Sequence, residues 1–424
     1  MHIGKRLREI RTIRGMTQAK VSKDIISAPH YSNIEAGIFT PSQDTLTLLA
    51  KRLAVPATYF THSYAEDKFM AELLQQYEGI LEKEDVALAN AFLKEHEKSF
   101  DYIQSLHQEL CFKLLRCLAL FKEKEFIAFQ QLYEEKILSY VDFDILHTLN
   151  IRLQEKYDYI TGLYHYIIGN HNDSIELFSK VLKISEDPLL HARLTFNIAL
   201  AHYRLFHYTE ALHYSKKARD CYLHLHNWDK TAECYNLMAV LYKDTNRLST
   251  AELYIHKGIQ ILNDKTIRIY TMLLHNLALV YQEQEQHKKA LETIENCIAI
   301  KKEYHSGTLF SSYREKLNIL LSLKDETEIT RTLEYARLVC KSSLEECHLR
   351  VIEGKQHFQH QRYDAYEKCL LQSIDYYLKH EQWEYLKCLP EELATYYAKK
   401  KHYKKAYELN LTGLLAFKKI YREL

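Results

Sequence analysis

The chain has 424 residues with only 10 glycines and 5 prolines, which is too few turn formers for an all-β protein and predicts a helical body. The formal net charge of +1 excludes a polycation that binds nucleic acid along its whole length. Three prolines and three glycines fall within residues 1–60, so a small loop-containing domain precedes a long helical one.

The positive charge is concentrated at the N-terminus. Residues 1–60 contain nine Lys/Arg and four Asp/Glu, a local charge of 9 − 4 = +5, which leaves 1 − 5 = −4 for the remainder. A compact basic head on a mildly acidic body suits binding of a phosphate backbone by the head alone.

The first helix is predicted by apolar residues at helical spacing, Ile3, Leu7, Ile10 and Ile13, and it stops at Gly15. Short helices with brief turns then continue to about residue 60, which is the pattern of a helix-turn-helix.

Capping residues mark the helices that follow. Thr17 is expected to cap the second helix and Ser27 the third, with Pro29 in its first turn. The third helix should run to about Glu35 and end at Gly37, a fourth covers about residues 42–53, and a fifth begins near residue 56.

Four segments of this region, residues 4–11, 15–18, 32–37 and 41–55, resemble the phage-repressor or Xre type of helix-turn-helix. The resemblance implies a double-stranded DNA operator as partner and an internal ion pair between Arg11 and Glu35. It also implies that the third helix enters the major groove. The residues it assigns to DNA are Thr17 and Gln18 at the start of helix two, where Gln18 bonds a phosphate, and Ala28, Pro29, His30 and Asn33 in the groove.

Residues 61–110 are predicted to be helical, with an apolar side formed by Phe69, Leu73, Leu74, Tyr77, Ile80 and Leu81. The pattern is compatible with a linker helix, a dimer contact or a divergent repeat, and the residues do not decide among these.

From about residue 110 a two-helix pattern recurs. A small residue or its equivalent in the second helix falls at Ser174, Ala211, Ala251, Ala290, Tyr366 and Ala406. In the first helix the small residue falls at Gly162, Ala199, Ala239, Ala278 and Ala394, each followed three residues later by His165, His202, Tyr242, Tyr281 or Tyr397. A degenerate repeat is expected around residues 315–338 and a weaker first repeat around residues 114–136, which gives about eight repeats.

This pattern resembles the tetratricopeptide repeat, in which stacked helix pairs form a superhelix with a concave inner face. The fold class is therefore all-α: a five-helix helix-turn-helix domain (residues 1–60), a linker or divergent repeat (61–110) and a repeat domain (111–424).

Three asparagines occupy one slot of successive repeats, at Asn197, Asn236 and Asn276, with spacings of 39 and 40 residues. In tetratricopeptide proteins this slot lies on the concave face, and an amide matches a peptide unit as both donor and acceptor. The alternative is that the asparagines only reflect repeat ancestry. Neighbouring positions on the same helices, Arg204, Lys243, Asp244 and Glu283, give this face mixed charge, which fits a short peptide better than a nucleic acid.

No catalytic or cofactor pattern is present. The 23 histidines form no His-Glu-x-x-His motif, the glycines form no phosphate loop, and no nucleophile pair is recognisable. The nine cysteines form no Cys-x-x-Cys pair and predict reduced thiols in a cytoplasmic protein. No signal peptide or apolar run of about 18 residues is visible, so we expect no membrane contact. Because the motifs named above are missing, we also expect no cofactor and no metal.

A repressor-type head followed by a long tetratricopeptide body resembles the RNPP family of Gram-positive quorum-sensing regulators, most closely the NprR type. The resemblance implies a transcription factor that binds a short imported signalling peptide in its concave groove and changes oligomeric state, as a homodimer or tetramer. It also implies a sporulation response regulator as partner of the peptide-free form. Two alternatives are a Rap-like protein–protein regulator that does not need DNA and a phage arbitrium-type peptide receptor.

Overall fold

The computed structural model describes residues 3–83, 85–138, 141, 146, 148–262, 266–304 and 307–420. These residues form α-helices with no strand among them, which confirms the all-α prediction. The chain divides into two compact units, Met1–Glu186 and Asp187–Leu424.

Five short helices form the N-terminal head: α1 (Ile3–Ile13), α2 (Gln18–Ser22), α3 (Ala28–Glu35), α4 (Gln43–Leu53) and α5 (Thr58–Thr61). The predicted caps are confirmed, because the Thr17 side chain accepts from the backbone N–H of Lys20 and the Ser27 side chain from that of His30. Gly15 and Gly37 have φ of 61° and 77°, left-handed conformations that end the preceding helices at low cost.

The head has its own core around Leu7, Tyr31, Ile34 and Leu49, which are fully buried. Helix α1 contacts α3 where a Cβ atom on Gly4 would lie 1.9 Å from the carbonyl oxygen of Ile34, so only glycine allows this approach. Ile13, expected on the apolar side of the first helix, is exposed.

Arg6 joins the head to the next part of unit 1. Its side chain is fully buried, pairs with Glu109 at 2.6 Å, and donates to the backbone carbonyls of Tyr59, Ile103 and Gln104. Arg6 is one of the nine basic residues counted in the charge of the head, but its guanidinium group is paired inside the protein. The expectation that the basic residues of the head are available to bind DNA is therefore wrong for Arg6.

Residues 61–110 are helical as expected, in α6 (Lys68–Glu82), α7 (Val86–Glu95), α8 (Glu97–Phe100) and the start of α9 (Leu106–Glu123). Leu73, Leu74, Tyr77 and Leu81 are buried, whereas Phe69 in the first turn of α6 is exposed. Gln108 of α9 exchanges two hydrogen bonds with the backbone of Asp67, so α9 packs closely against the start of α6.

Eight helix pairs follow among the described residues, in agreement with the prediction of about eight repeats. In unit 1 they are α9 with α10 (Phe126–Tyr133), extended by a π-helix (Glu134–Leu138), and α12 (Ile151–Ile167) with α13 (His171–Ile184). In unit 2 they are α14 (Pro188–Arg204) with α15 (Tyr208–His224), α16 (Trp228–Asp244) with α17 (Leu248–Ile261), α18 (Ile267–Glu283) with α19 (His287–Glu303), α20 (Leu309–Leu323) with α21 (Glu326–Val339), α22 (Ser343–Gln359) with α23 (Tyr363–Lys379), and α24 (Leu389–Lys399) with α25 (Tyr403–Ile420), preceded by the 3-10 turn η2 (Trp383–Leu386).

Small residues let the paired helices approach, as the repeat pattern predicted. Ala199, Ala211, Ala239 and Ala251 are all at most 1% exposed. A Cβ atom on Gly162 would lie 2.5 Å from the ring of Phe178. Many of these helices have 17 residues, which accounts for a period longer than the usual 34.

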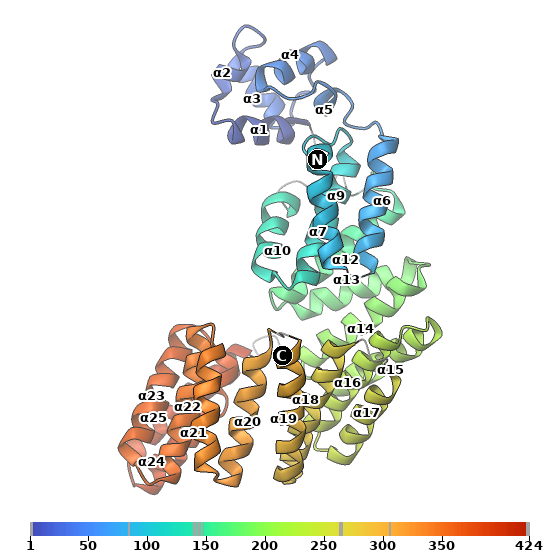
Figure 1. Cartoon of the computed structure of the whole chain (residues 1–424). Coiled ribbons are helices and arrows are strands. Elements are labelled where there is room, and N and C mark those ends of the chain that lie inside the picture. The colour runs from blue at the N-terminus through green and yellow to red at the C-terminus, as the bar shows by residue number, and fades with distance from the viewer. Residues whose placement is uncertain are drawn as a thin grey trace. The chain divides into compact units, whose positions relative to one another are not determined.

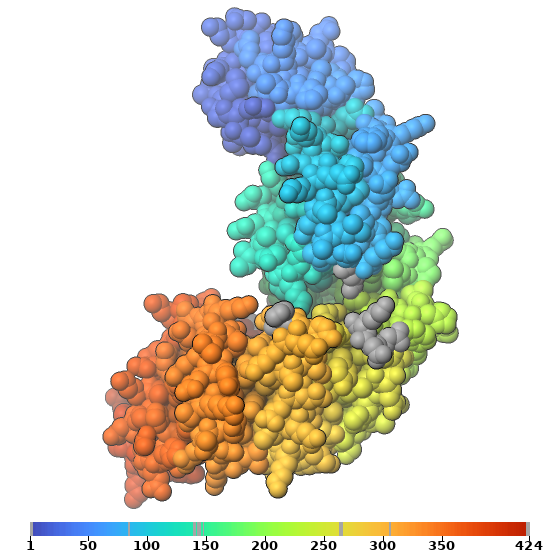
Figure 2. Space-filling model, in the orientation of Figure 1, coloured from blue at the N-terminus to red at the C-terminus, as the bar shows by residue number. Residues whose placement is uncertain are grey.

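In unit 2 the pairs stack in chain order, so that each touches its neighbours (Figures 1 and 2). The first helices of successive pairs contact each other directly, α16 with α18, α18 with α20, and α20 with α22. Second helices of successive pairs contact each other less within the part of the chain that the structure describes. The first helices therefore line the inside of the curve, and we call this surface the inner face.

Candidate functional site

The three asparagines all lie on first helices of unit 2, Asn197 on α14, Asn236 on α16 and Asn276 on α18. All three side chains are half-buried. Asn276 donates from Nδ2 to Oδ1 of Asn236 at 2.6 Å, a hydrogen bond between residues 40 positions apart. Each amide of this pair retains further hydrogen-bonding capacity, because an amide carries two N–H donors and an acceptor oxygen. The bond thus orients the two amides while leaving polar groups for a ligand.

A second polar network lies one to two turns further along the same helices. Lys243 pairs with Asp244 at 2.8 Å and with Glu283 on the next first helix at 3.2 Å. Tyr203 of α14 donates to Asp244 at 2.9 Å. Burial opposes the charge of Lys243, but the hydrogen bond that its ammonium group donates to Asp244 and the charges of Asp244 and Glu283 raise its pKa. The network connects three successive repeats and keeps the lysine charged.

The structure therefore brings together five of the seven residues that the sequence assigned to a peptide. Asn197 has no side-chain hydrogen bond with any described residue, so its amide is available. Arg204 is the last residue of α14 and is exposed.

Glu315 is a residue of this face that the sequence analysis missed. It lies on α20, 39 positions after Asn276, and thus continues the spacing of the row. It is buried, and burial raises the pKa of its carboxyl group, while the charge of Lys243 lowers it. The repeat spacing could have identified it, but a carboxyl group in an asparagine slot breaks the residue pattern.

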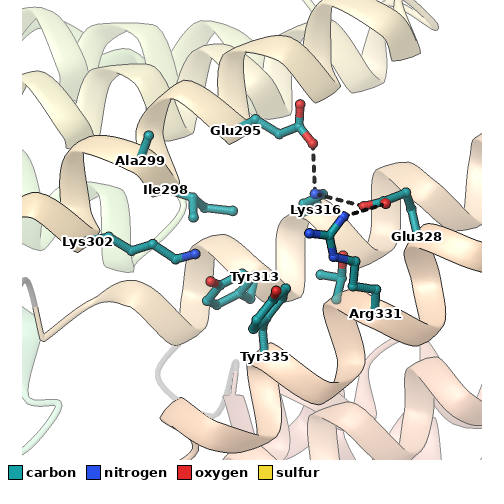
Figure 3. Close-up of a pocket in the computed structure, with 10 residues that line it drawn as sticks. Glu295, Ile298, Ala299, Lys302, Tyr313, Lys316, Glu328, Arg331 and Tyr335 are labelled. Atoms are coloured by element: carbon teal, nitrogen blue, oxygen red, sulfur yellow. Dashed lines mark hydrogen bonds and ion pairs between the residues drawn. The ribbon is translucent and has the colours of Figure 1, made fainter.

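A pocket of about 460 Å³ lies between α19, α20 and α21 (Figure 3). At one end the ammonium group of Lys302 lies over the rings of Tyr313 and Tyr335, at 5.6 and 5.1 Å. At the other end Lys316 lies between Glu295 and Glu328, at 2.7 and 3.5 Å. Two of its three walls are second helices, so this pocket is separate from the row of amides, and most of its charges are already paired.

The second candidate surface is the head. Glu35 receives hydrogen bonds from Arg11 at 2.6 Å and from Gln18 at 2.8 Å, which confirms the internal ion pair. Burial would raise the pKa of Glu35, but these bonds hold it below its ordinary value. The amide nitrogen of Gln18 is engaged with Glu35, so a phosphate contact would use its remaining N–H or a rearranged side chain.

The residues assigned to the groove lie together on α3. Pro29 and Asn33 are exposed, and Ala28 and His30 are half-buried. The ring of His30 packs edge-on against Phe39, with centroids 4.5 Å apart. Thr17 is exposed at the start of α2, but its oxygen already caps that helix. The assignment of these residues to DNA stays a prediction.

No group of three or more His, Cys, Asp or Glu side chains that could hold a metal ion occurs among the described residues. None of the helices in the described ranges is long and apolar enough to cross a membrane. The nine cysteines are free thiols.

Comparison with known proteins agrees with both parts of this architecture. The helix-turn-helix family matches residues 7–60, and the tetratricopeptide repeat family matches residues 273–304. The transcriptional activator NprA of Geobacillus stearothermophilus is 23% identical over 416 residues, which cover 90% of this chain and 95% of NprA. A transcriptional activator as relative agrees with the expectation that the chain is not an enzyme.

Two solved structures share the fold. The apo form of the quorum sensor NprR from B. thuringiensis superposes with a TM-score of 0.67 at 14% identity, over 82% of this chain and 99% of NprR. NprR in complex with its cognate peptide NprX gives 0.58 at 14% identity, over 81% and 97%. The chain therefore combines a helix-turn-helix domain with a tetratricopeptide body, is similar in sequence to NprA over nearly its whole length, and shares its fold with NprR.

Proposed function

We propose that this protein is a transcriptional regulator whose DNA binding responds to a short signalling peptide held on the inner face of unit 2. The observation that carries the proposal is the paired amides of Asn236 and Asn276, with the unpaired amide of Asn197 in the same slot one repeat earlier. A row of amides can bond consecutive units of an extended peptide backbone. The structure of NprR with its peptide NprX lends support by analogy of fold.

The network around Lys243 suits a peptide with its own charges. The lysine is shared between Asp244 and Glu283, and both carboxylates have partly exposed side chains. A charged peptide group can displace one of these partners at small cost, because each ion pair near the surface contributes only about 0–1 kcal/mol. A nucleic acid would meet three carboxyl groups here, counting Glu315.

The hydrogen bonds between first helices on the inner face offer a route by which a bound peptide can change the arrangement of the repeats. They cross from α14 to α16 and from α16 to α18, so they fix how successive repeats sit against one another. A peptide that replaces these bonds favours a different stacking, and its effect equals the difference in its affinity for the two arrangements. The peptide would thereby change how two heads are presented to an operator.

Calorimetry with the purified chain tests the peptide site. The probe is a set of synthetic peptides from the C-terminal segment of any short secreted precursor encoded beside the gene. Asn236→Ala and Asn276→Ala should each weaken binding by about 1–3 kcal/mol, the usual cost of a hydrogen bond lost from a buried backbone group. Asn90→Ala is the matched control, since Asn90 lies on α7 and bonds Glu123 outside the array of unit 2. Unchanged affinity in both inner-face variants would refute the site.

The DNA role is tested separately with substitutions on the outside of the head. Asn33→Ala and Lys20→Ala change exposed residues and should leave the fold intact. Loss of operator binding with peptide affinity retained is the expected result. If both variants still regulate transcription in cells, DNA binding by the head is not required. The alternative of a Rap-like protein–protein regulator then replaces the proposed transcriptional regulator.

A further inference from the structure

The pocket between α19, α20 and α21, which we call the α19–α21 pocket, has two ends of different character (Figure 3). At one end Lys316 lies between Glu295 and Glu328, so two carboxylates face its ammonium group. At the other end Lys302 forms no ion pair with any residue in the described ranges, and its ammonium group lies over two tyrosine rings. The second end therefore carries a positive charge that is available to an anion.

The two rings give the cationic end a flat apolar surface. Tyr313 and Tyr335 are stacked, with centroids 6.2 Å apart and planes at 21°. Tyr313 is 4% exposed, whereas Tyr335 is 39% exposed and keeps accessible ring surface. The buried side chain of Ile298 adds aliphatic lining. A planar ring suits this surface, because aromatic rings stack offset or edge to face on one another.

A buried hydroxyl group independently indicates a ligand in the pocket. Thr332 of α21 lines the pocket and is 1% exposed, yet its hydroxyl forms no hydrogen bond with any residue that the structure describes. Thr330 on the same helix, by contrast, donates to the backbone carbonyl of Glu326. Buried polar groups are nearly always hydrogen-bonded, because an unpaired one has lost its bond to water. The Thr332 hydroxyl is thus available to a polar group held in the pocket.

The charge balance decides which anion fits. Lys302 has no carboxylate partner among the described residues, and an ammonium group has three N–H donors for an anion. Arg331 borders the pocket over Tyr335, but its guanidinium group already pairs with Glu328 at 3.3 Å. A dianion would meet the carboxylates of Glu295 and Glu328, whereas a single carboxylate matches a single lysine. The volume of about 460 Å³ suits a small molecule, since such sites measure about 300–1,000 Å³.

We propose that the α19–α21 pocket binds a small aromatic carboxylate. The carboxylate group pairs with Lys302, and the ring stacks on Tyr335. The Thr332 hydroxyl, one turn before Tyr335 on α21, bonds a polar substituent of the ring. The ligand contacts α19 and α21 of successive repeats, so it stabilises their stacking. This inference depends on neither the proposed peptide nor the proposed operator.

Isothermal titration calorimetry with the full chain tests the ligand class. The probes are phenylacetate, hydroxyphenylacetate and indoleacetate, each titrated to millimolar concentration, and at least one should bind. Phenylacetamide lacks the charge, cyclohexylacetate lacks the aromatic ring, and phenyl phosphate carries two charges, so each should bind more weakly than phenylacetate. The proposal is overturned if none of the three acids binds, or if the amide or the phosphate binds as tightly as phenylacetate.

Substitutions test the location of the site. Lys302→Met keeps most of the aliphatic stem and should weaken binding at least about tenfold, because it removes a charged hydrogen-bond donor. Tyr335→Leu should weaken it about threefold to tenfold through lost stacking. Lys289→Met is the matched control, since Lys289 is an exposed lysine of the same helix that also lies over a ring, that of Tyr281 at 5.6 Å, outside the pocket. Equal affinities of the Lys302→Met and Lys289→Met variants would contradict the assignment.

The hydroxyl group has a test of its own. Thr332→Val keeps the shape of the side chain and should lower affinity for hydroxyphenylacetate several-fold while leaving that for phenylacetate unchanged. An equal loss for both acids would show that Thr332 acts only through packing. Far-ultraviolet circular dichroism checks that every variant is folded.

Two variants distinguish this pocket from the peptide site. Lys302→Met should bind the signalling peptide with wild-type affinity, because Lys302 lies on a second helix, away from the amide row. Asn236→Ala should leave the affinity for the aromatic acids unchanged. If Asn236→Ala abolishes binding of the acids, they occupy the inner face and the pocket assignment fails. If the acids bind as expected while no peptide binds, only the proposed function fails.

Discussion

His275 gives a prediction whose size follows from the structure. It stands next to Asn276 on α18, and its Nδ1 atom is buried without a hydrogen-bond partner. Burial, together with the positive charges of Lys301 and Arg314, lowers the pKa of its imidazole from 6.5 to about 4. The folded protein therefore holds this side chain neutral at pH values at which the unfolded chain protonates it.

The sign and the size of the pH effect follow by linkage. Because the folded pKa is depressed, the contribution of His275 to the free energy of unfolding is intact above pH 6.5 and is lost as the pH falls toward 4. The full loss is about 3 kcal/mol, and about 2 kcal/mol of it occurs by pH 5. In His275→Leu this pH-dependent contribution to the free energy of unfolding is absent.

Urea denaturation at a series of pH values from 7.5 to 5 measures the effect. The difference in the free energy of unfolding between wild type and His275→Leu should shift by about 2 kcal/mol in favour of the variant as the pH falls to 5. Groups that titrate in the same way in both proteins cancel in this difference. A difference that stays constant across the range would show that His275 is not held neutral in the folded state.

Three further substitutions test the packing. Gly4→Ala should destabilise the head by about 1–3 kcal/mol despite better helix propensity, because its Cβ atom meets the backbone oxygen of Ile34; thermal unfolding measures this, and no change would contradict the close approach. Lys301→Met should raise the melting temperature, since burial lowers the pKa of this lysine and no carboxylate pairs with it in the described residues. Arg6→Met should cost about 3 kcal/mol or more, because it removes one of the two cations that pair with the buried Glu109, Lys113 being the other, and the donor to three backbone carbonyls. Adding Glu109→Leu should recover part of the loss, and a double variant less stable than Arg6→Met would contradict the pairing.

Local chemistry made much of the fold predictable. The caps Thr17 and Ser27 and the stop at Gly37 were readable because each acts within one helical turn of its position. The helix pairs could be predicted because each repeat must bury the same face against its neighbour. Small residues such as Ala239 and Ala278 therefore recur at the positions where the helices approach each other.

The contacts that cross the repeats were not predictable in the same way. The bond between Asn236 and Asn276 depends on how two helices 40 residues apart stack, and no local pattern sets that distance. The burial of Arg6 depends on Glu109, 103 residues away, so the sequence alone grouped this arginine with the DNA-facing charges. Residue types suggested both candidate surfaces, but their packing decides which groups remain available to a ligand.

The most direct test of the central claim measures operator affinity by fluorescence anisotropy with and without the peptide. In wild type the peptide should shift the affinity. In the Asn236→Ala/Asn276→Ala double variant the same peptide concentration should leave it unchanged, while affinity without peptide equals that of wild type. A full peptide response in the double variant would show that the amide row of the inner face does not control the head.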